Sequence, residues 1–285
     1  HETTGNAQFR LVWDTGAEQG AMARLDSAVA LARRSAVAVV VAGIEEGEFR
    51  DRARLGLPGY QEELIRRVAA TGTPTVVVLV GGSAITMPWL DAVGAVLMAW
   101  YPGQEGGHAV SDILLGDVSP SGRLPISFPV EEGQLPLTYN HRPTGRGDDY
   151  ADLSGRPLFP FGFGLSYTSF SYDSFVIVPS AIAPGSTAEV LLRVRNTGAR
   201  AGHEVIQLYL RDEVATFARP VLQLAGFTRV WLEPGEAREV RFTLRPEQLA
   251  VLDAALRPVV EPGTFTVYVG ASSRDIRLRC TLEAH

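Results

Sequence analysis

The sequence contains no lysine, because all 26 of its basic residues are arginine. Schiff-base chemistry, a Walker-type phosphate loop and pyridoxal chemistry all depend on a lysine amine, so they are excluded within this chain. Cysteine is nearly absent as well. Cys280 stands alone and cannot form an internal disulfide. Its strand-like surroundings predict a small, buried hydrophobic side chain rather than a redox centre.

Long apolar runs and basic clusters are also missing. The longest apolar run, residues 35–43, is far shorter than the roughly 18 residues of a membrane span, so no membrane segment is expected. A net charge of −6 without a visible basic face argues against nucleic acid binding. The first residues show neither a signal peptide nor an initiator methionine, so we expect the chain to begin inside a longer protein. The composition is that of a soluble protein and leaves the compartment, cytoplasmic or secreted, open.

The first half of the chain alternates between two kinds of pattern. Apolar residues at helical spacing predict helices over residues 22–34, 60–70, 83–91 and 107–115. Apolar runs rich in β-branched residues predict strands over residues 36–43, 75–80, 95–100 and 124–128. The first of these strands is apolar on both faces, which is typical of the middle of a parallel sheet. This alternation predicts an open, mostly parallel α/β sheet, with Ser83 as the cap of the third helix.

The second half changes to short alternating segments separated by turn residues. They predict seven strands, over residues 174–179, 187–196, 204–211, 222–232, 238–244, 263–270 and 276–283. Seven strands in this length indicate an all-β fibronectin type III or immunoglobulin-like sandwich. Residues 130–165 lack periodicity and form a long connection. We therefore expect a tail of an upstream segment (1–15, with a strand at 7–13), an α/β domain (16–129), a connecting segment (130–172) and the sandwich (173–285).

The loop after the first strand gathers charged side chains. Ligands of open α/β sheets bind at the carboxyl ends of the strands, and this loop lies there. It carries the acidic residues Glu45, Glu46, Glu48 and Asp51 among the arginines Arg50, Arg52 and Arg54. A crowded or desolvated carboxyl group acquires the raised pKa that a proton donor needs. From spacing alone, a solvated charged loop is the preferred explanation of the pattern.

Several collinear motifs resemble glycoside hydrolase family 3. Residues 43–65 combine a Glu-rich loop, Asp-Arg, spaced leucines, Leu-Pro-Gly and Gln before Leu-Ile, as the second domain of that family does. The similarity continues through residues 79–85, 100–107, 116–128 and 159–168. Residues 205–212 and 224–230 resemble the fibronectin type III-like domain that follows in many members. The resemblance thus covers most of the chain in the right order.

What the resemblance implies is retaining hydrolysis by two carboxyl groups about 5–5.5 Å apart. The nucleophile of the family is an aspartate on a preceding (β/α)8 barrel, which has no counterpart in this sequence. The other group is the acid/base. Matching Gly47 to Arg52 on the family's Gly-Glu-x-x-Asp-Arg pattern assigns that role to Glu48, with Glu46 as second choice. Asp51 and Arg52 are expected to hold the loop, and no metal or organic cofactor is implied.

Other candidate sites in the sequence have weaker support. The stretch Gly81-Gly82-Ser83 matches neither a phosphate-binding nor a nucleophile-elbow motif. His108, His141 and His203 lack the spacing of metal ligands. An unrelated α/β hydrolase or nucleotide-binding domain is therefore disfavoured.

The expected function is that of the C-terminal part of an exo-acting β-glucosidase acting on an oligosaccharide or β-glycoside. Its barrel half is expected in the same or a companion chain. A β-xylosidase or arabinosidase of the same family stays open, as does a non-catalytic carbohydrate-binding accessory subunit. Trp100 and Tyr101 end a strand on the ligand side, where they face a sugar or pack into the core.

Overall fold

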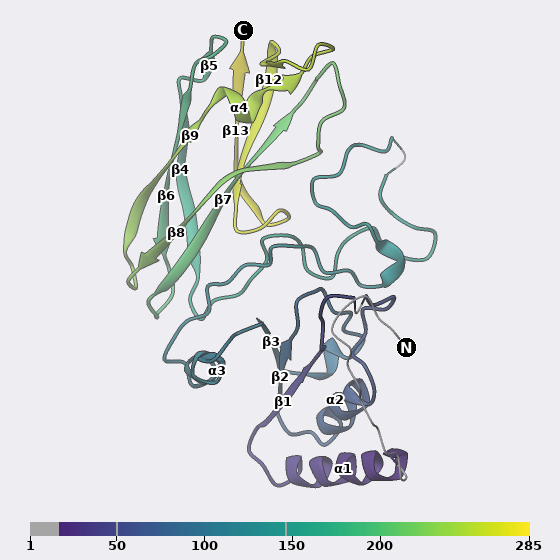
Figure 1. Cartoon of the computed structure of the whole chain (residues 1–285). Helices are drawn as coiled ribbons and strands as arrows, with labels where there is room; N and C mark the ends of the chain where they lie inside the picture. Colours follow the sequence, from purple (N-terminus) through teal and green to yellow (C-terminus); the bar gives the residue numbers. More distant parts are fainter. Residues whose placement is uncertain (1–16, 50, 146) are drawn as a thin grey trace. The chain divides into compact units, whose positions relative to one another are not determined.

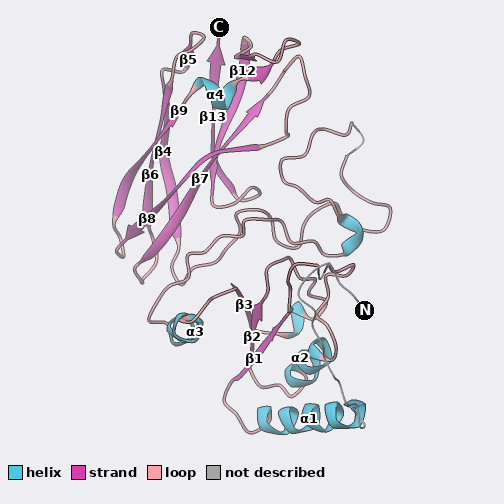
Figure 2. Ribbon diagram, viewed as in Figure 1, coloured by secondary structure: helices cyan, strands magenta, loops and turns pink. Residues whose placement is uncertain are grey.

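The computed structural model describes residues 17–49, 51–145 and 147–285 (Figure 1). The described residues form two compact units. The α/β unit comprises residues 17–83 and 87–101, and the β unit comprises residues 84–86 and 102–285. Helices and parallel strands build the first, and strands dominate the second (Figure 2). The predicted fold class is confirmed. The predicted strand at residues 7–13 lies outside the described residues, and the predicted domain boundaries stay predictions.

The α/β unit is built on three parallel strands in the order β1 (Ala38–Gly43), β2 (Thr75–Val80) and β3 (Ala95–Trp100). Consecutive residues Val77, Val78 and Leu79 of β2 are all buried, so both faces of the central strand are covered. Helix α2 (Gln61–Ala69) packs on β1 and β2 and contacts α1 (Ala17–Ala32).

The place of β1 differs from the prediction. In the described sheet β1 is an edge strand, and its Val39 and Val41 are exposed. Its β-branched residues favour a strand, but that preference does not distinguish a central strand from an edge strand. Among residues 17–145 that the structure describes, no helix crosses the predicted span 83–91; only a 3-10 turn, η1 (Leu90–Ala92), begins there.

The predicted helix at residues 83–91 was wrong for two local reasons. Pro88 lacks the backbone N–H that a helix interior requires. The hydroxyl of Ser83 donates to the carboxylate of Glu46 instead of capping a helix. The apolar spacing that suggested a helix reflects burial in an irregular segment, where Trp89 is 2% exposed. The other predicted helices correspond to α1, α2 and α3 (Gly106–Leu115).

The predicted strand at residues 124–128 was also wrong, because it does not join the parallel sheet. Its two ends pair with a later segment. The N–H of Leu124 donates to the carbonyl of Phe163, and that of Phe128 to the carbonyl of Phe159, both at 2.8 Å. Pro125 has no N–H to continue a ladder, so the pairing stays an isolated bridge.

The β unit contains the predicted sandwich, and all seven predicted strands are present. Its strands are β4 (Phe170–Val178), β5 (Ala181–Ile182), β6 (Ala188–Asn196), β7 (Gly202–Asp212), β8 (Gln223–Leu232), β9 (Ala237–Leu244), β12 (Gly263–Gly270) and β13 (Ile276–Ala284). One sheet has the order β5-β13-β12-β7-β8 and the other β4-β6-β9. The turn α4 (Pro246–Leu249) and the short pair β10 (Val251–Leu252) and β11 (Pro258–Val259) complete the sandwich.

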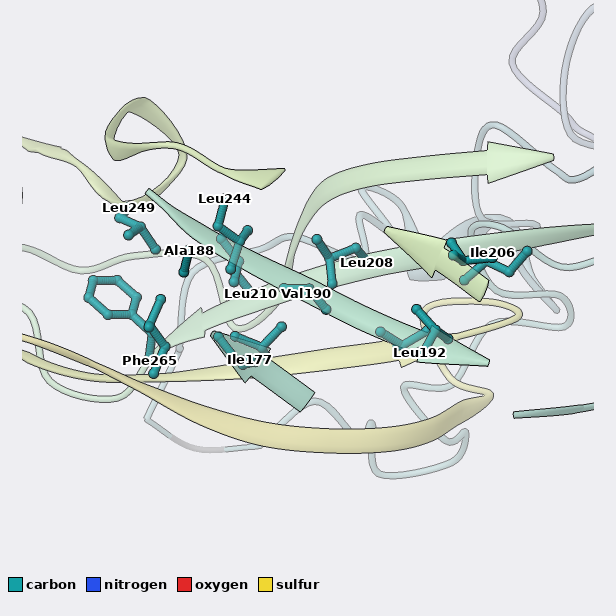
Figure 3. Close-up of a cluster of buried hydrophobic side chains, with 14 of the residues drawn as sticks. Ile177, Ala188, Val190, Leu192, Ile206, Leu208, Leu210, Leu244, Leu249 and Phe265 are labelled. Atoms are coloured by element: carbon teal, nitrogen blue, oxygen red, sulfur yellow. The ribbon is translucent and has the colours of Figure 1, made fainter. Parts of the chain in front are cut away.

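The core of the sandwich comes from the alternation of side chains along each strand. On β6, Val190 and Leu192 are buried, whereas Arg193 between the strand's inward residues is exposed. Figure 3 shows Val190 and Leu192 of β6 with Leu208 and Leu210 of β7 in one apolar cluster. Cys280 packs against this core as a hydrophobic side chain, but it is only partly buried, so the prediction that it is buried was wrong. No described helix is long and apolar enough to cross a membrane.

The connecting segment is ordered against the sandwich through a buried amide. The side-chain Nε2 of Gln207 on β7 donates to the carbonyls of Gly162, at 3.0 Å, and Ala271, at 2.7 Å. A Cβ atom at Gly162 would lie 2.0 Å from the Gln207 Oε1 atom, and the φ angle there is 80°. Both the contact and the left-handed backbone therefore require glycine in this Phe-Gly-Phe-Gly stretch.

A buried charged cluster attaches the residues that precede the connecting segment to the sandwich. Glu204 of β7 is 2% exposed. One of its oxygens accepts a bond from Arg123 Nη2 at 2.9 Å, and the other accepts from the Tyr172 hydroxyl at 2.7 Å. The Arg277 guanidinium lies 3.9 Å from Glu204 and 4.6 Å above the Tyr172 ring. Burial, together with the Glu204 charge, raises the pKa of Tyr172. A charge this deep is tolerated because it is paired.

Candidate active-site loop

The charged loop leaves β1 at Gly43 and crosses the carboxyl ends of the strands before α2. Two glycines let it pass close to the neighbouring strand end. A Cβ at Gly43 would lie 2.1 Å from the Val80 carbonyl oxygen, and one at Gly81 would lie 2.5 Å from Ile44 Cγ1. Larger residues at either point would push the loop away from the sheet.

Within the loop, Glu46 is held by three hydrogen-bond donors. Its carboxylate accepts the Gly82 N–H at 2.7 Å, the Tyr101 hydroxyl at 2.8 Å and the Ser83 hydroxyl. Gly82 follows β2 and Tyr101 follows β3, so the contacts span the ends of both strands. Arg52 Nη1 adds a longer ionic contact of 3.8 Å.

These contacts set the charge of Glu46. The Ser83 hydrogen bond is the main reason why the pKa of Glu46 lies below its usual value, and Tyr101, Gly82 and Arg52 act in the same direction against the effect of burial. The same Glu46 contact raises the pKa of Tyr101. Glu46 is therefore an ionised acceptor whose lone pairs are engaged, and Tyr101 stays protonated.

Glu48, two residues further on, has a different environment. Its side chain is exposed, and no hydrogen bond or ion pair joins it to the described residues. Phe49 follows with a φ angle of 64° and an exposure of 84%. A bulky residue in the left-handed region is a conformational outlier, which marks the tip of this loop as constrained. The loop thus presents Glu48 to solvent beside an exposed aromatic ring.

Two further side chains fix the loop on either side of Glu48. Gln61 of α2 brackets the backbone of Gly43, accepting its N–H at 2.7 Å and donating to its carbonyl at 2.9 Å. Arg52 Nη2 donates to the carbonyls of Arg54, at 2.7 Å, and Gly56, at 2.8 Å. The prediction that Arg52 holds the loop is confirmed. Asp51 is exposed and has no such contact with a described residue.

The partners of Glu46 differ from what the sequence predicted. Ser83 was expected to cap a helix, and Tyr101 to face a sugar or the core; it is 59% exposed and bonds to Glu46. The chain turns toward Glu46 at Trp100, where φ is 54° and the β2–β3 ladder shifts register. The sequence did contain a signal, because both residues lie within three positions of the end of a predicted parallel strand, and such strand ends meet at one edge of the sheet.

Metal ligands do not gather in the described parts of the chain. Among residues 17–49, 51–145 and 147–285, no three His, Cys, Asp or Glu side chains are placed to share an ion. The described histidine closest to a carboxylate is His141, whose Nε2 lies 3.7 Å from Asp148.

The family of the chain is decided by its match to known domain models. Residues 6–167 match the model of the glycosyl hydrolase family 3 C-terminal domain, and residues 204–273 match that of a fibronectin type III-like domain. The chain belongs to glycosyl hydrolase family 3. The resemblance predicted from its motifs is confirmed.

Family 3 relatives of two specificities are similar to this chain. A β-xylosidase of Formosa agariphila is 42% identical over 255 residues, which cover 87% of this chain and 35% of that protein. A β-glucosidase of Bacteroides ovatus is 38% identical, covering 90% of this chain and 37% of that protein. The family 3 chain described here therefore spans a little over one third of these relatives.

Solved structures agree with this family assignment. A β-glucosidase from Erythrobacter marinus superposes with a TM-score of 0.89 and 39% identity, covering 94% of this chain and 37% of that one. A β-glucosidase from Listeria innocua in complex with gluconolactone gives a TM-score of 0.87 and 34% identity, with 91% and 38% coverage. The family 3 fold of both units is thus shared with known β-glucosidases.

Proposed function

We propose that this chain supplies the general acid/base of a retaining, exo-acting β-glycosidase, and that Glu48 is that residue. The observation that carries the proposal is the contrast between two neighbouring carboxylates. Glu48 is exposed with no described partner, at the edge of a parallel sheet where ligands bind. Glu46 is bonded to Gly82, Ser83 and Tyr101.

The same contrast disfavours Glu46 as the proton donor. A general acid must hold a proton and reach the leaving oxygen. The pKa of Glu46 is lowered, chiefly by the Ser83 hydrogen bond, and protonation would disrupt the bonds that its carboxylate accepts. In this environment Glu46 is expected to stay ionised rather than to gain and release a proton.

In the proposed reaction Glu48 acts twice. It first protonates the glycosidic oxygen of the leaving group while a second carboxylate forms a glycosyl-enzyme intermediate. It then removes a proton from the water that hydrolyses this intermediate. The second carboxylate, about 5–5.5 Å away, belongs to a part of the protein outside this chain.

For the substrate we favour a terminal β-glucoside, since several similar proteins and solved structures are β-glucosidases. A β-xyloside is the second candidate, because a relative with 42% identity is a β-xylosidase. Comparing kcat/KM of the complete protein on aryl β-glucosides and aryl β-xylosides decides between them. Higher kcat/KM on the xyloside would reverse the preference.

The acid role is tested by Glu48→Gln in the complete protein. Without the acid, kcat/KM for a phenyl glycoside, a poor leaving group, is expected to fall about 10²–10⁴-fold. The kcat/KM for a dinitrophenyl glycoside, whose leaving group departs without protonation, is expected to change little. Added azide should partly restore turnover of the activated substrate by replacing the water that Glu48 no longer activates.

Glu63→Gln serves as the matched control, since Glu63 is an exposed carboxylate of α2 in the same unit. This control should leave kcat/KM for both substrates unchanged. Equal losses on both substrates in Glu48→Gln would contradict an acid/base role. A complete protein without activity on any β-glycoside would favour the non-catalytic accessory subunit.

A further inference from the structure

We propose that Glu46 is a positioning residue for Glu48: its bonds to the ends of β2 and β3 hold the loop in the form that presents the acid. This inference rests on the proposed function of Glu48. It assigns to Glu46 a role distinct from proton transfer, and makes Tyr101 and Ser83 part of the same support.

The first support is geometric. Glu46 follows β1 by three residues, and its donors come from the residues just after β2 and β3. These donors are 36, 37 and 55 positions away in the sequence. One carboxylate therefore joins the carboxyl ends of all three strands of the described sheet. A side chain with that connectivity transmits the rigidity of the sheet to the loop.

The second support is the fit of the carboxylate. A Cβ atom at Gly82 would lie 2.7 Å from Glu46 Oε2 and 2.7 Å from Tyr101 Cε2. A side chain at residue 82 would therefore crowd both the Glu46 carboxylate and the Tyr101 ring. All three donors point to one anionic acceptor, so an amide at position 46 would place an NH2 group against at least one of them.

The third support is the distance along the chain to Glu48. Glu46 lies two residues before it, and Arg52, bonded to the carbonyls of Arg54 and Gly56, lies four residues after it. Both ends of this short span are thus attached, while Glu48 and Phe49 between them are exposed. Because proton transfer depends steeply on geometry, a shift of about 1 Å in such a loop can cost 10²-fold in rate.

The test uses the leaving-group ratio in the complete protein, defined as kcat/KM for the phenyl glycoside divided by that for the dinitrophenyl glycoside. In Glu46→Gln this ratio is expected to fall about 10- to 100-fold, because only the poor leaving group needs a well-placed acid. Tyr101→Phe removes one exposed donor and should lower the ratio less, in the same direction. Glu63→Gln is the control and should leave the ratio unchanged.

A second measurement separates positioning from general structural damage. In a Glu48→Gln background the acid is already absent, so adding Glu46→Gln should lower the ratio no further. A loss equal on both substrates, or a further fall of the ratio in the double variant, would overturn the inference. If Glu46→Gln lowers the ratio while Glu48→Gln does not, the proposed function of Glu48 fails and the inference fails with it. If only Glu48→Gln lowers it, the proposed function stands and the inference alone fails.

Discussion

The buried carboxylate of Glu204 offers a quantitative test of how the β unit is held together. Its oxygens accept bonds from Arg123 and Tyr172, and the side chains of Glu204 and Arg123 are 2% and 9% exposed. Glu204→Ala would leave the Arg123 guanidinium buried without its counter-charge and the Tyr172 hydroxyl without its acceptor. Removing one partner of a buried pair costs about 3–5 kcal/mol of unfolding free energy.

Two further variants divide this cost. Tyr172→Phe removes only the hydroxyl bond to a charged acceptor, and is expected to cost about 1.5–3 kcal/mol. Combining Glu204→Ala with Arg123→Met removes both charges, so the double variant should be more stable than Glu204→Ala alone. Glu239→Ala, which removes an exposed carboxylate on β9, is the control and should change stability by less than about 0.5 kcal/mol.

The assay is native-state hydrogen exchange of the backbone amides in β7 and β12, because these report the opening of the β unit itself. Urea unfolding followed by circular dichroism gives an independent value from the midpoint and the m-value. A change below about 1 kcal/mol for Glu204→Ala, or a double variant less stable than that single one, would refute the reasoning about uncompensated buried charge.

Two remaining predictions concern the same unit. Gly162→Ala combines a left-handed backbone with a contact of 2.0 Å to Gln207, whereas Gly185→Ala has the same φ of 80° and nothing within 4 Å. Gly185→Ala should lower the unfolding free energy by about 1–2 kcal/mol through the backbone alone, and Gly162→Ala should lower it clearly more. Equal losses of unfolding free energy in urea would contradict the steric contribution at Gly162. Burial, with the Glu204 charge, raises the pKa of Tyr172 above its unfolded value near 10. The contribution of Tyr172 to the unfolding free energy is therefore complete below about pH 10. It declines at higher pH, because the unfolded state loses the phenolic proton first. Tyr172→Phe should reduce the alkaline slope of unfolding free energy without abolishing it, because burial also raises the pKa of Tyr209. An unchanged slope would contradict the assignment.

Local patterns explain how much of the fold the sequence predicts. The seven main strands of the sandwich follow from alternation of the kind seen in β6, where Val190 and Leu192 point inward and Arg193 outward. Alternation is a property of neighbouring residues, so no knowledge of partners is needed. The errors at residues 83–91 and 124–128 arose where apolar residues are buried in irregular segments that contain Pro88 and Pro125. There, burial without regular structure imitates a helix or a strand.

The candidate site, too, is partly predictable from the sequence and partly decided by the tertiary structure. The sequence by itself determined that a charged loop follows the first strand, and the contiguous Gly-Glu-x-x-Asp-Arg pattern let the family resemblance single out Glu48, with Glu46 as second choice. Which of the two carboxylates is engaged was decided only by the tertiary structure. The donors to Glu46 are 36 to 55 residues distant and converge because parallel strands end at one edge. Likewise, Glu204 is an ordinary strand residue in the sequence, and only the fold places Arg123, 81 positions away, against it. Composition and local spacing determine which elements form and where charges lie along the chain, whereas hydrogen bonds between distant residues determine which charges are bound and which stay exposed.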